Sequence, residues 1–289
     1  MTAVAVVLVL VSAVFHAGRD YLAKRSTDKL AFSWWYHVVG LLIMLPTLAW
    51  TLREAVALQG MLYACASGLA HAFYLYTLAE AYQAGDLSLV YPISRSAPLF
   101  VFLWAAVVWH ERMTSIGMMG VLMTVLGAYV LQLRRWSLAD LAAPLVALRR
   151  HRATRLAWAT ALLVAVYSLI DARGVKVVSP VLYLVAYSLV GLAASTPIVL
   201  LKARLHLWGE LRTHWRGIAL AGILSPVGYL LALMALRISP VSYVSSVRQV
   251  GIVIGVALGA LLLREPYGRR RLVASGIMVG GMLLIAVFG

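Results

Sequence analysis

The chain alternates long apolar runs with short polar gaps. Ten runs approach or exceed the roughly 20 residues that an α-helix needs to cross a membrane, at a rise of about 1.5 Å per residue. Each run is expected to be helical, because a helix satisfies its backbone hydrogen bonds within one lipid-bound segment. The pattern predicts an all-α polytopic membrane protein with ten transmembrane helices. The runs cover residues 2–18, 32–51, 58–83, 87–109, 114–133, 156–177, 180–202, 215–236, 240–263 and 270–288.

Two of these runs are weaker than the others. The run 2–18 is short, and the run 156–177 holds Asp171 and Arg173 near its end. The longest gap, 134–155, is rich in arginine and leaves five runs on either side of it.

The second half of the chain repeats the first. Shifting 86–112 by 154 positions places it on 240–266, and a shift of 151 positions aligns the earlier runs. Because each half has an odd number of helices, the halves must cross the membrane in opposite directions, as in the inverted repeats of many carriers. We predict two inverted five-helix repeats, 1–133 and 156–289, joined by a basic connecting segment, 134–155. Matched pairs are Gly40 with Gly191, Pro46 with Pro197, Ser88 with Ser242, Glu111 with Glu265 and Gly127 with Gly281.

Composition agrees with a membrane protein. Of the 289 residues, 63% are apolar and 12% are charged, which is too little polar surface for a soluble domain of this size. The formal net charge of +15 would favour a nucleic-acid partner in a soluble protein. Here the basic residues lie in the gaps between apolar runs, where they set topology, so we expect no nucleic-acid binding. The single cysteine, Cys65, excludes an internal disulfide and a cysteine metal cluster.

Positive charge is distributed unevenly between the two sides of the predicted bundle. Of the 25 lysines and arginines, 18 lie in or beside the gaps after the first, third, fifth, seventh and ninth runs, and 5 lie on the opposite side. Arg95 and Arg248 are the other two. Basic gaps remain in the cytoplasm, so we expect a multi-pass protein of a bacterial inner membrane with both termini outside.

The end of each half resembles the EamA-type members of the drug/metabolite transporter superfamily. The resemblance lies in LSLVYPISRSAPLFVFLWAAVVWHERMTSIGMMGVLMTVLGAYV and in VSYVSSVRQVGIVIGVALGALLLREPYGRRRLVASGIMVGGMLLI. In each, a helix that opens with Ser, Tyr and Val ends at a glutamate, and a glycine-bearing helix follows. The resemblance implies a ten-helix carrier, often an exporter of amino acids or other small metabolites, whose central cavity is lined by the third and fourth helices of each half. EamA-type members usually have cytoplasmic termini, so the charge pattern of this chain differs from theirs.

Two arginines stand out within the predicted helices. Arg95 and Arg248 each lie 8 residues inside a run, which is on the order of 12 Å deep and close to the midplane of a ~30 Å core. A charge at that depth is costly and usually functional. A guanidinium can bind a carboxylate, phosphate or phosphonate through two hydrogen bonds. The alternative is a structural ion pair, for which Glu80 is the partner that the sequence offers to Arg95.

Other polar side chains are expected around these arginines. Glu80 and His71 are candidates for proton coupling. A structural ion pair explains Glu80 equally well, and a lone histidine such as His71 is more often an ordinary hydrogen-bonding residue. Pro92 and Pro98 bracket Arg95 and predict a kink that frees backbone carbonyls. Tyrosines would shape the apolar part of a cavity and add hydroxyl groups. The full set of predicted substrate-binding residues is Tyr74, Tyr91, Ser94, Arg95, Tyr229, Tyr243, Arg248 and Gln249.

These features predict a secondary transporter, an exporter or permease, that moves a small anionic or zwitterionic metabolite by alternating access. One alternative is a lipid-carrier flippase of the same superfamily, in which the arginines hold a lipid phosphate. A second is an intramembrane enzyme acting on a lipid-linked substrate, with His71 and Glu80 as acid and base. The chain lacks dinucleotide, phosphate-loop, zinc-ligand and serine-nucleophile motifs, so we expect no enzyme, cofactor or metal. We expect membrane lipids as partners and a monomer or homodimer.

The charge pattern makes a direct prediction about topology. A reporter that functions only outside the cytoplasm should be active when it is fused to either chain end. A reporter that functions only in the cytoplasm should be inactive at both ends. The reverse activities at both ends would overturn the assignment based on charge.

Overall fold

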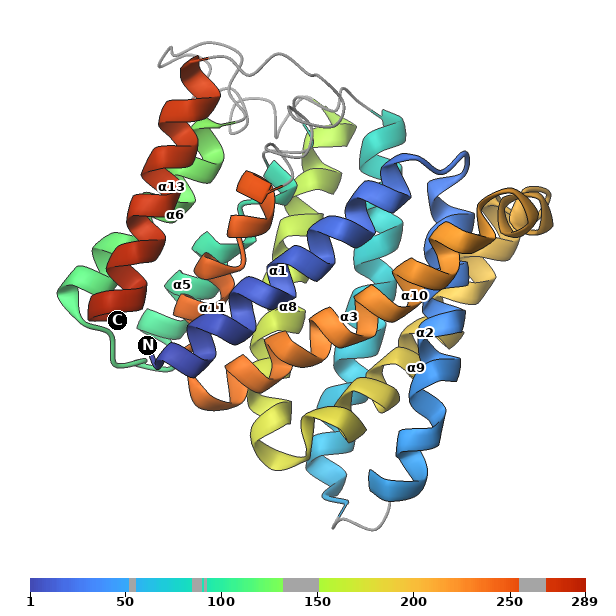
Figure 1. Ribbon diagram of the computed structural model, residues 1–289, viewed down its shortest axis with the longest axis horizontal. Coiled ribbons are helices and arrows are strands. Elements are labelled where there is room, and N and C mark those ends of the chain that lie inside the picture. Colours follow the sequence, from blue (N-terminus) through green and yellow to red (C-terminus); the bar gives the residue numbers. More distant parts are fainter. Residues whose placement is uncertain (52–55, 85–89, 91–92, 132–150, 255–268) are drawn as a thin grey trace.

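The computed structural model describes residues 1–51, 56–84, 90, 93–131, 151–254 and 269–289. Within these residues the regular structure is entirely helical, as the apolar pattern predicted (Figure 1). The helices are α1 (Ala3–Lys24), α2 (Lys29–Thr51), α3 (Leu58–Ala84), α5 (Ala97–Val107), α6 (Ser115–Val130), α8 (Arg152–Val177), α9 (Pro180–Lys202), α10 (Leu207–Ile238), α11 (Val241–Val247) and α13 (Arg269–Phe288).

Five of the described helices are long and apolar enough to cross a membrane, namely α1, α2, α8, α9 and α10. Several shorter apolar helices accompany them. The crossing of the membrane by all ten predicted segments stays a prediction. The first helix is longer than its apolar run, because it continues through Arg19 and Asp20 to Lys24. Charge therefore ended the apolar run but not the helix.

The two segments that carry Arg95 and Arg248 are interrupted helices. Backbone turns occupy 95–96 and 248–249, with helical residues on both sides of each turn. Pro98 cannot donate a backbone hydrogen bond, and the Leu99 amide donates to the Ser96 carbonyl at 3.0 Å. The Arg95 carbonyl is therefore left for a partner elsewhere, as the flanking prolines predicted.

Helices of the two halves pack against each other in matched pairs. α3 packs along α8 and α9, while α10 packs along α1 and α2 (Figure 1). A Cβ atom added to Gly40 would lie 3.0 Å from the carbonyl oxygen of Gly222, and one added to Gly68 would lie 2.6 Å from that of Tyr187. Gly40 matches Gly191 at the shift of 151, and Gly68 matches Gly222 at the shift of 154. The same close helix crossing is therefore built twice.

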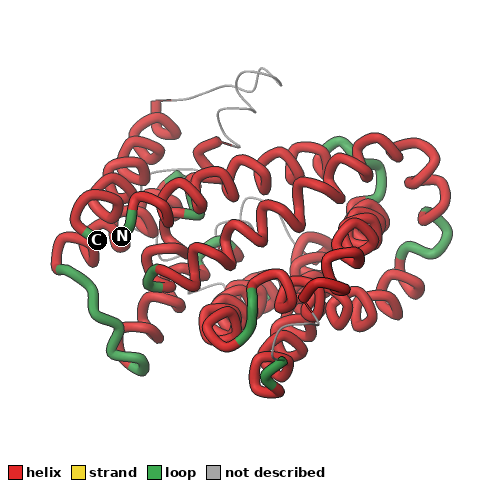
Figure 2. The backbone as a smooth tube through the Cα atoms, turned by 60° about the horizontal axis from the view of Figure 1, so that its bottom comes forward, coloured by secondary structure: helices red, strands yellow, loops and turns green. Residues whose placement is uncertain are grey.

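The described connections fall on two opposite faces. On the basic face, the connections 25–28 and 203–206 lie together, since the His206 Nδ1 is 3.0 Å from an Asp28 carboxylate oxygen. On the terminal face, the two chain ends lie side by side in both views (Figures 1 and 2). The Met1 amino group donates to the Gly289 carbonyl there. The connection 25–28 follows the end of α1 and Met1 precedes its start, so the two faces lie at opposite ends of this helix.

Helices α6 and α13 form a pair at one end of the molecule (Figure 1). A Cβ atom on Gly281 would lie 2.5 Å from the Gly120 carbonyl oxygen and 2.6 Å from the Thr124 hydroxyl. In contrast, a Cβ atom on the exposed Gly276 of the same helix would meet no atom within 4 Å.

Gly281→Leu should therefore destabilise the protein by about 2 kcal/mol or more, because a side chain forced against backbone must displace a helix. Gly276→Leu, the matched control, should leave stability nearly unchanged. Thermal unfolding in detergent measures both variants. Equal unfolding temperatures for the two variants would contradict the packing of α6 on α13.

Candidate functional site

The two interrupted helices meet at their interruptions. The Gln249 side-chain amide donates to the Arg95 backbone carbonyl at 2.8 Å, which is the carbonyl left by the first turn. Gln249 is buried, and the two residues are equivalent positions of the repeats at the shift of 154. Contact between equivalent positions places this hydrogen bond at the axis that relates the two halves. The substrate-binding candidates Arg95 and Gln249 are thus brought together.

Around Arg95, charge is supplied by α1. A guanidinium nitrogen of Arg95 lies 3.8 Å from an Asp20 carboxylate oxygen, and the Arg19 guanidinium lies 2.7 Å from the other oxygen. The side chains of Arg95 and Asp20 are 41% and 45% exposed, so small molecules can reach both groups. The Arg19 guanidinium also lies 5.9 Å from the ring centre of Tyr36 on α2. Two guanidinium groups therefore share the Asp20 carboxylate.

The second arginine lies over an aromatic ring. The Arg248 guanidinium is 5.5 Å from the ring centre of Tyr229 on α10, a distance typical of a cation–π contact. It is also close enough to His71 and Asp171 to interact with them electrostatically. Tyr229, another predicted substrate-binding residue, is therefore part of the arginine site in the second repeat.

Asp171 is the buried acid at the centre of this cluster. It is wholly inaccessible to solvent, and three hydroxyl groups donate to its carboxylate. Ser67 of α3 donates at 2.5 Å and Tyr183 of α9 at 2.7 Å, both to Oδ1, while the Tyr229 hydroxyl donates to Oδ2. With Asp171 on α8, this hydroxyl cage joins four helices from both repeats.

The sequence reading passed over Asp171 because it lies near the end of an apolar run. A signal was nevertheless present, since the shift of 151 places Asp20 on Asp171 and Tyr36 on Tyr187. A search for polar residues repeated at matched depth would have found both aspartates. Asp20 follows the apolar run 2–18 in the sequence, but it lies inside α1 and faces Arg95.

His71 and Tyr74 lie on the same side of the cluster. The His71 ring stacks on Tyr167 of α8 with ring centres 3.8 Å apart, and Tyr74 lies edge-on to Tyr167 at 5.9 Å. The Nδ1 atom of His71 is 2.9 Å from the Ser67 carbonyl oxygen. The Ser67 hydroxyl in turn donates to Asp171, so Ser67 lies between His71 and the buried acid.

Glu80 is paired differently from our expectation. Its carboxylate forms ion pairs with Arg152 of α8, at 2.8 Å, and with Lys202 of α9. These contacts correct the alternative in which Glu80 pairs with Arg95, and the Arg95 guanidinium instead lies 3.8 Å from Asp20. The reason is distance along the helix, because Glu80 lies nine residues, or about 13 Å, beyond His71 toward the basic face. The pairing of His71 with Glu80 as acid and base loses its basis.

Three further candidates lie apart from the cluster or outside the described residues. Tyr243 is buried, and its hydroxyl accepts a hydrogen bond from the Thr114 amide at 3.0 Å, close to the terminal face. Ser94 is buried and donates to the Val90 carbonyl of its own helix at 2.9 Å. Tyr91 lies outside the described residues. Tyr243 and Ser94 are therefore engaged in packing and backbone contacts.

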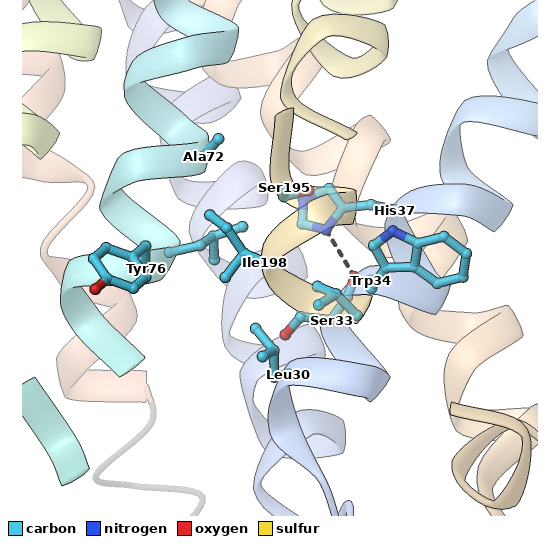
Figure 3. Close-up of a pocket in the computed structure, with 10 residues that line it drawn as sticks. Leu30, Ser33, Trp34, His37, Ala72, Tyr76, Ser195 and Ile198 are labelled. Atoms are coloured by element: carbon cyan, nitrogen blue, oxygen red, sulfur yellow. Dashed lines mark hydrogen bonds between the residues drawn. The ribbon is translucent and has the colours of Figure 1, made fainter. Parts of the chain in front are cut away.

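Two cavities lie near the cluster and at the basic face. The first, between α2, α3 and α9, has a volume of about 10 Å³ (Figure 3). His37 lines it, with Nδ1 2.8 Å from the Ser33 carbonyl oxygen. Such a volume holds about one water molecule. The second cavity, about 460 Å³, lies at the basic face between Arg25, His214 and Arg216. Among the described residues, no group of three or more histidine, cysteine or acidic side chains could hold a metal ion.

Comparison with known proteins identifies the fold and the family. The model of the EamA-like transporter family matches residues 3–133 and 153–287, one match in each half. The chain has no significant match among curated proteins. A solved structure titled only "Crystal structure of protein" superposes with a TM-score of 0.73 at 16% sequence identity, over 98% of this chain and 96% of that chain. This likeness shows a shared fold.

Proposed function

Because the chain belongs to the EamA-like transporter family, we propose that it is a secondary transporter of a small organic metabolite that carries a negative group. Family membership makes it a multi-pass membrane transporter of the drug/metabolite superfamily, whose EamA-type members are transporters rather than enzymes. The chemistry of the solute and the mechanism are our proposal. The observation that carries it is the meeting of the two helix interruptions, each with an arginine, between the repeats.

The charges of the cluster favour an anionic or zwitterionic solute. Three guanidinium groups, those of Arg19, Arg95 and Arg248, stand against the carboxyl groups of Asp20 and Asp171. A carboxylate or phosphate on the solute would bind one of these guanidinium groups through two charge-assisted hydrogen bonds. Tyrosine rings beside the arginines would contact the apolar part of the solute. The rings that surround Arg248 and His71 are Tyr167, Tyr187 and Tyr229.

The inverted arrangement supports alternating access. In inverted-repeat carriers, one half rocks against the other around a site near the midplane. Here the Gln249 to Arg95 hydrogen bond lies between the halves, and interrupted helices can bend with few lost backbone bonds. We assign the basic face to the cytoplasm by the positive-inside rule, so both termini would lie outside.

Replacing either arginine tests this proposal. Arg95→Gln and Arg248→Gln should each slow solute exchange by roughly tenfold or more, because a lost charge-assisted hydrogen bond costs at least about 1.5 kcal/mol. The assay is counterflow in proteoliposomes, with radiolabelled monocarboxylates, dicarboxylates, amino acids and sugar phosphates as probes.

Arg216→Gln is the matched control, because Arg216 stacks on Trp215 away from the cluster. It should exchange the probes at the wild-type rate, and all three variants should insert into the membrane equally. Wild-type exchange by both cluster variants would refute the proposal.

A further inference from the structure

We infer that Asp171 is the proton-binding site of this transporter and that its protonation prepares Arg248 to take the negative group of the solute. The first part concerns the solute-free protein and stands on the geometry of the hydroxyl cage. The second part rests on the proposed function, because it needs an anionic solute at Arg248.

The cage satisfies the ionised carboxylate completely. An ionised carboxylate only accepts hydrogen bonds, and the three groups around Asp171, from Ser67, Tyr183 and Tyr229, are all able to donate. Burial without such donors would be costly for a charged group. The ionised form is therefore held firmly, with bonds to three other helices.

The cage also has a place for the proton. A protonated carboxyl group becomes a donor and needs an acceptor. The Tyr183 hydroxyl has a second acceptor for its own hydrogen, the Tyr63 carbonyl oxygen, at 3.3 Å. When Asp171 is protonated at Oδ1, Tyr183 can turn its hydrogen toward Tyr63 and accept the new hydrogen bond. The proton is gained from solvent and returned to it, and rotation of one hydroxyl accommodates both states.

No other acid faces this site from the described helices that pack on α8. The helix α5 carries no titratable side chain, and Glu80 of α3 is engaged at the basic face. The remaining titratable or charged groups are tyrosine hydroxyls, an arginine, and a histidine that contacts Ser67 rather than Asp171 itself. These titratable or charged neighbours are Tyr167 on α8, His71 on α3, Tyr183 and Tyr187 on α9, Tyr229 on α10, and Arg248 after α11.

Tyr229 connects the acid to the arginine. Its hydroxyl donates to Asp171, and its ring face lies under the Arg248 guanidinium. While Asp171 is ionised, its charge offsets that of Arg248. Once Asp171 is neutral, Arg248 attracts an anion more strongly. Proton and anion therefore bind cooperatively and would move in the same direction, as in cotransport.

The hydroxyl cage has no counterpart around Asp20, the residue equivalent to Asp171 in the first repeat. Positions equivalent to Tyr183, Ser67 and Tyr229 in the other repeat are apolar, namely Phe32, Ala221 and Leu75. Asp20, the equivalent of Asp171, is held by arginines and is partly exposed. Duplication of the fold alone therefore does not explain three hydroxyls around a buried acid. Of these two equivalent aspartates, only Asp171 has the cage that accommodates a proton.

Infrared spectroscopy of the solute-free protein in proteoliposomes tests the proton site. Acidification should produce the carbonyl-stretch band of a protonated, buried carboxyl group. Asp171→Asn should lose this band, whereas Glu80→Gln should keep it with the wild-type midpoint. Tyr183→Phe keeps the acid but removes its proton acceptor, so the band should shift in frequency and in midpoint pH. A band that persists unchanged in Asp171→Asn or in Tyr183→Phe would overturn the assignment.

Transport of an anion tests the coupling. With a radiolabelled monocarboxylate that wild-type protein exchanges, accumulation driven by a proton gradient should be lost in Asp171→Asn and kept in Glu80→Gln, whose carboxylate is engaged at the basic face. Gradient-driven accumulation by Asp171→Asn would refute coupling at this residue. If wild-type protein exchanges none of the probes, the proposed function fails, while the infrared band still decides whether Asp171 binds a proton.

Discussion

Charge held inside an apolar bundle is the constraint on which the rest of this structure depends. A buried charge is tolerated only when hydrogen bonds or opposite charges compensate it. Around Asp171, three hydroxyls from three helices provide that compensation. Around Asp20, the compensation comes from two guanidinium groups. Because the Asp171 carboxylate draws its partners from three other helices, these contacts fix how α3, α8, α9 and α10 can pack.

The two repeats use one scaffold for different chemistry. The close helix crossing at Gly40 and Gly222 recurs as the crossing at Gly191 and Gly68, so the two repeats place these helices in the same way. The polar residues follow the same registers less strictly, since Arg95 is equivalent to Gln249, one position from Arg248. An approximately symmetric frame therefore surrounds an asymmetric site. One half contributes partly exposed charge and the other a buried acid.

Much of the fold could be predicted from the sequence, because apolar length and repeated glycines report helices and their close contacts. Arg95 and Arg248 were also found, since an arginine within an apolar run is visible in one dimension. Which charged residues pair with each other could not be predicted, because the pairing depends on which helices cross. Hydropathy places Asp20 and Asp171 at the ends of apolar runs, whereas both lie within helices. Tyr243, in contrast, packs near the terminal face, where its hydroxyl accepts from the Thr114 amide, and its contact with a solute stays a prediction.

The central claim is that a solute's negative group binds where the interrupted helices meet. A cryo-electron microscopy structure with a counterflow-active carboxylate bound tests it most directly. The carboxylate should lie within hydrogen-bond distance of Arg95 or Arg248, beside the Gln249 to Arg95 contact. Density for the carboxylate in the basic-face cavity between Arg25 and Arg216, with the central cluster unchanged, would contradict it.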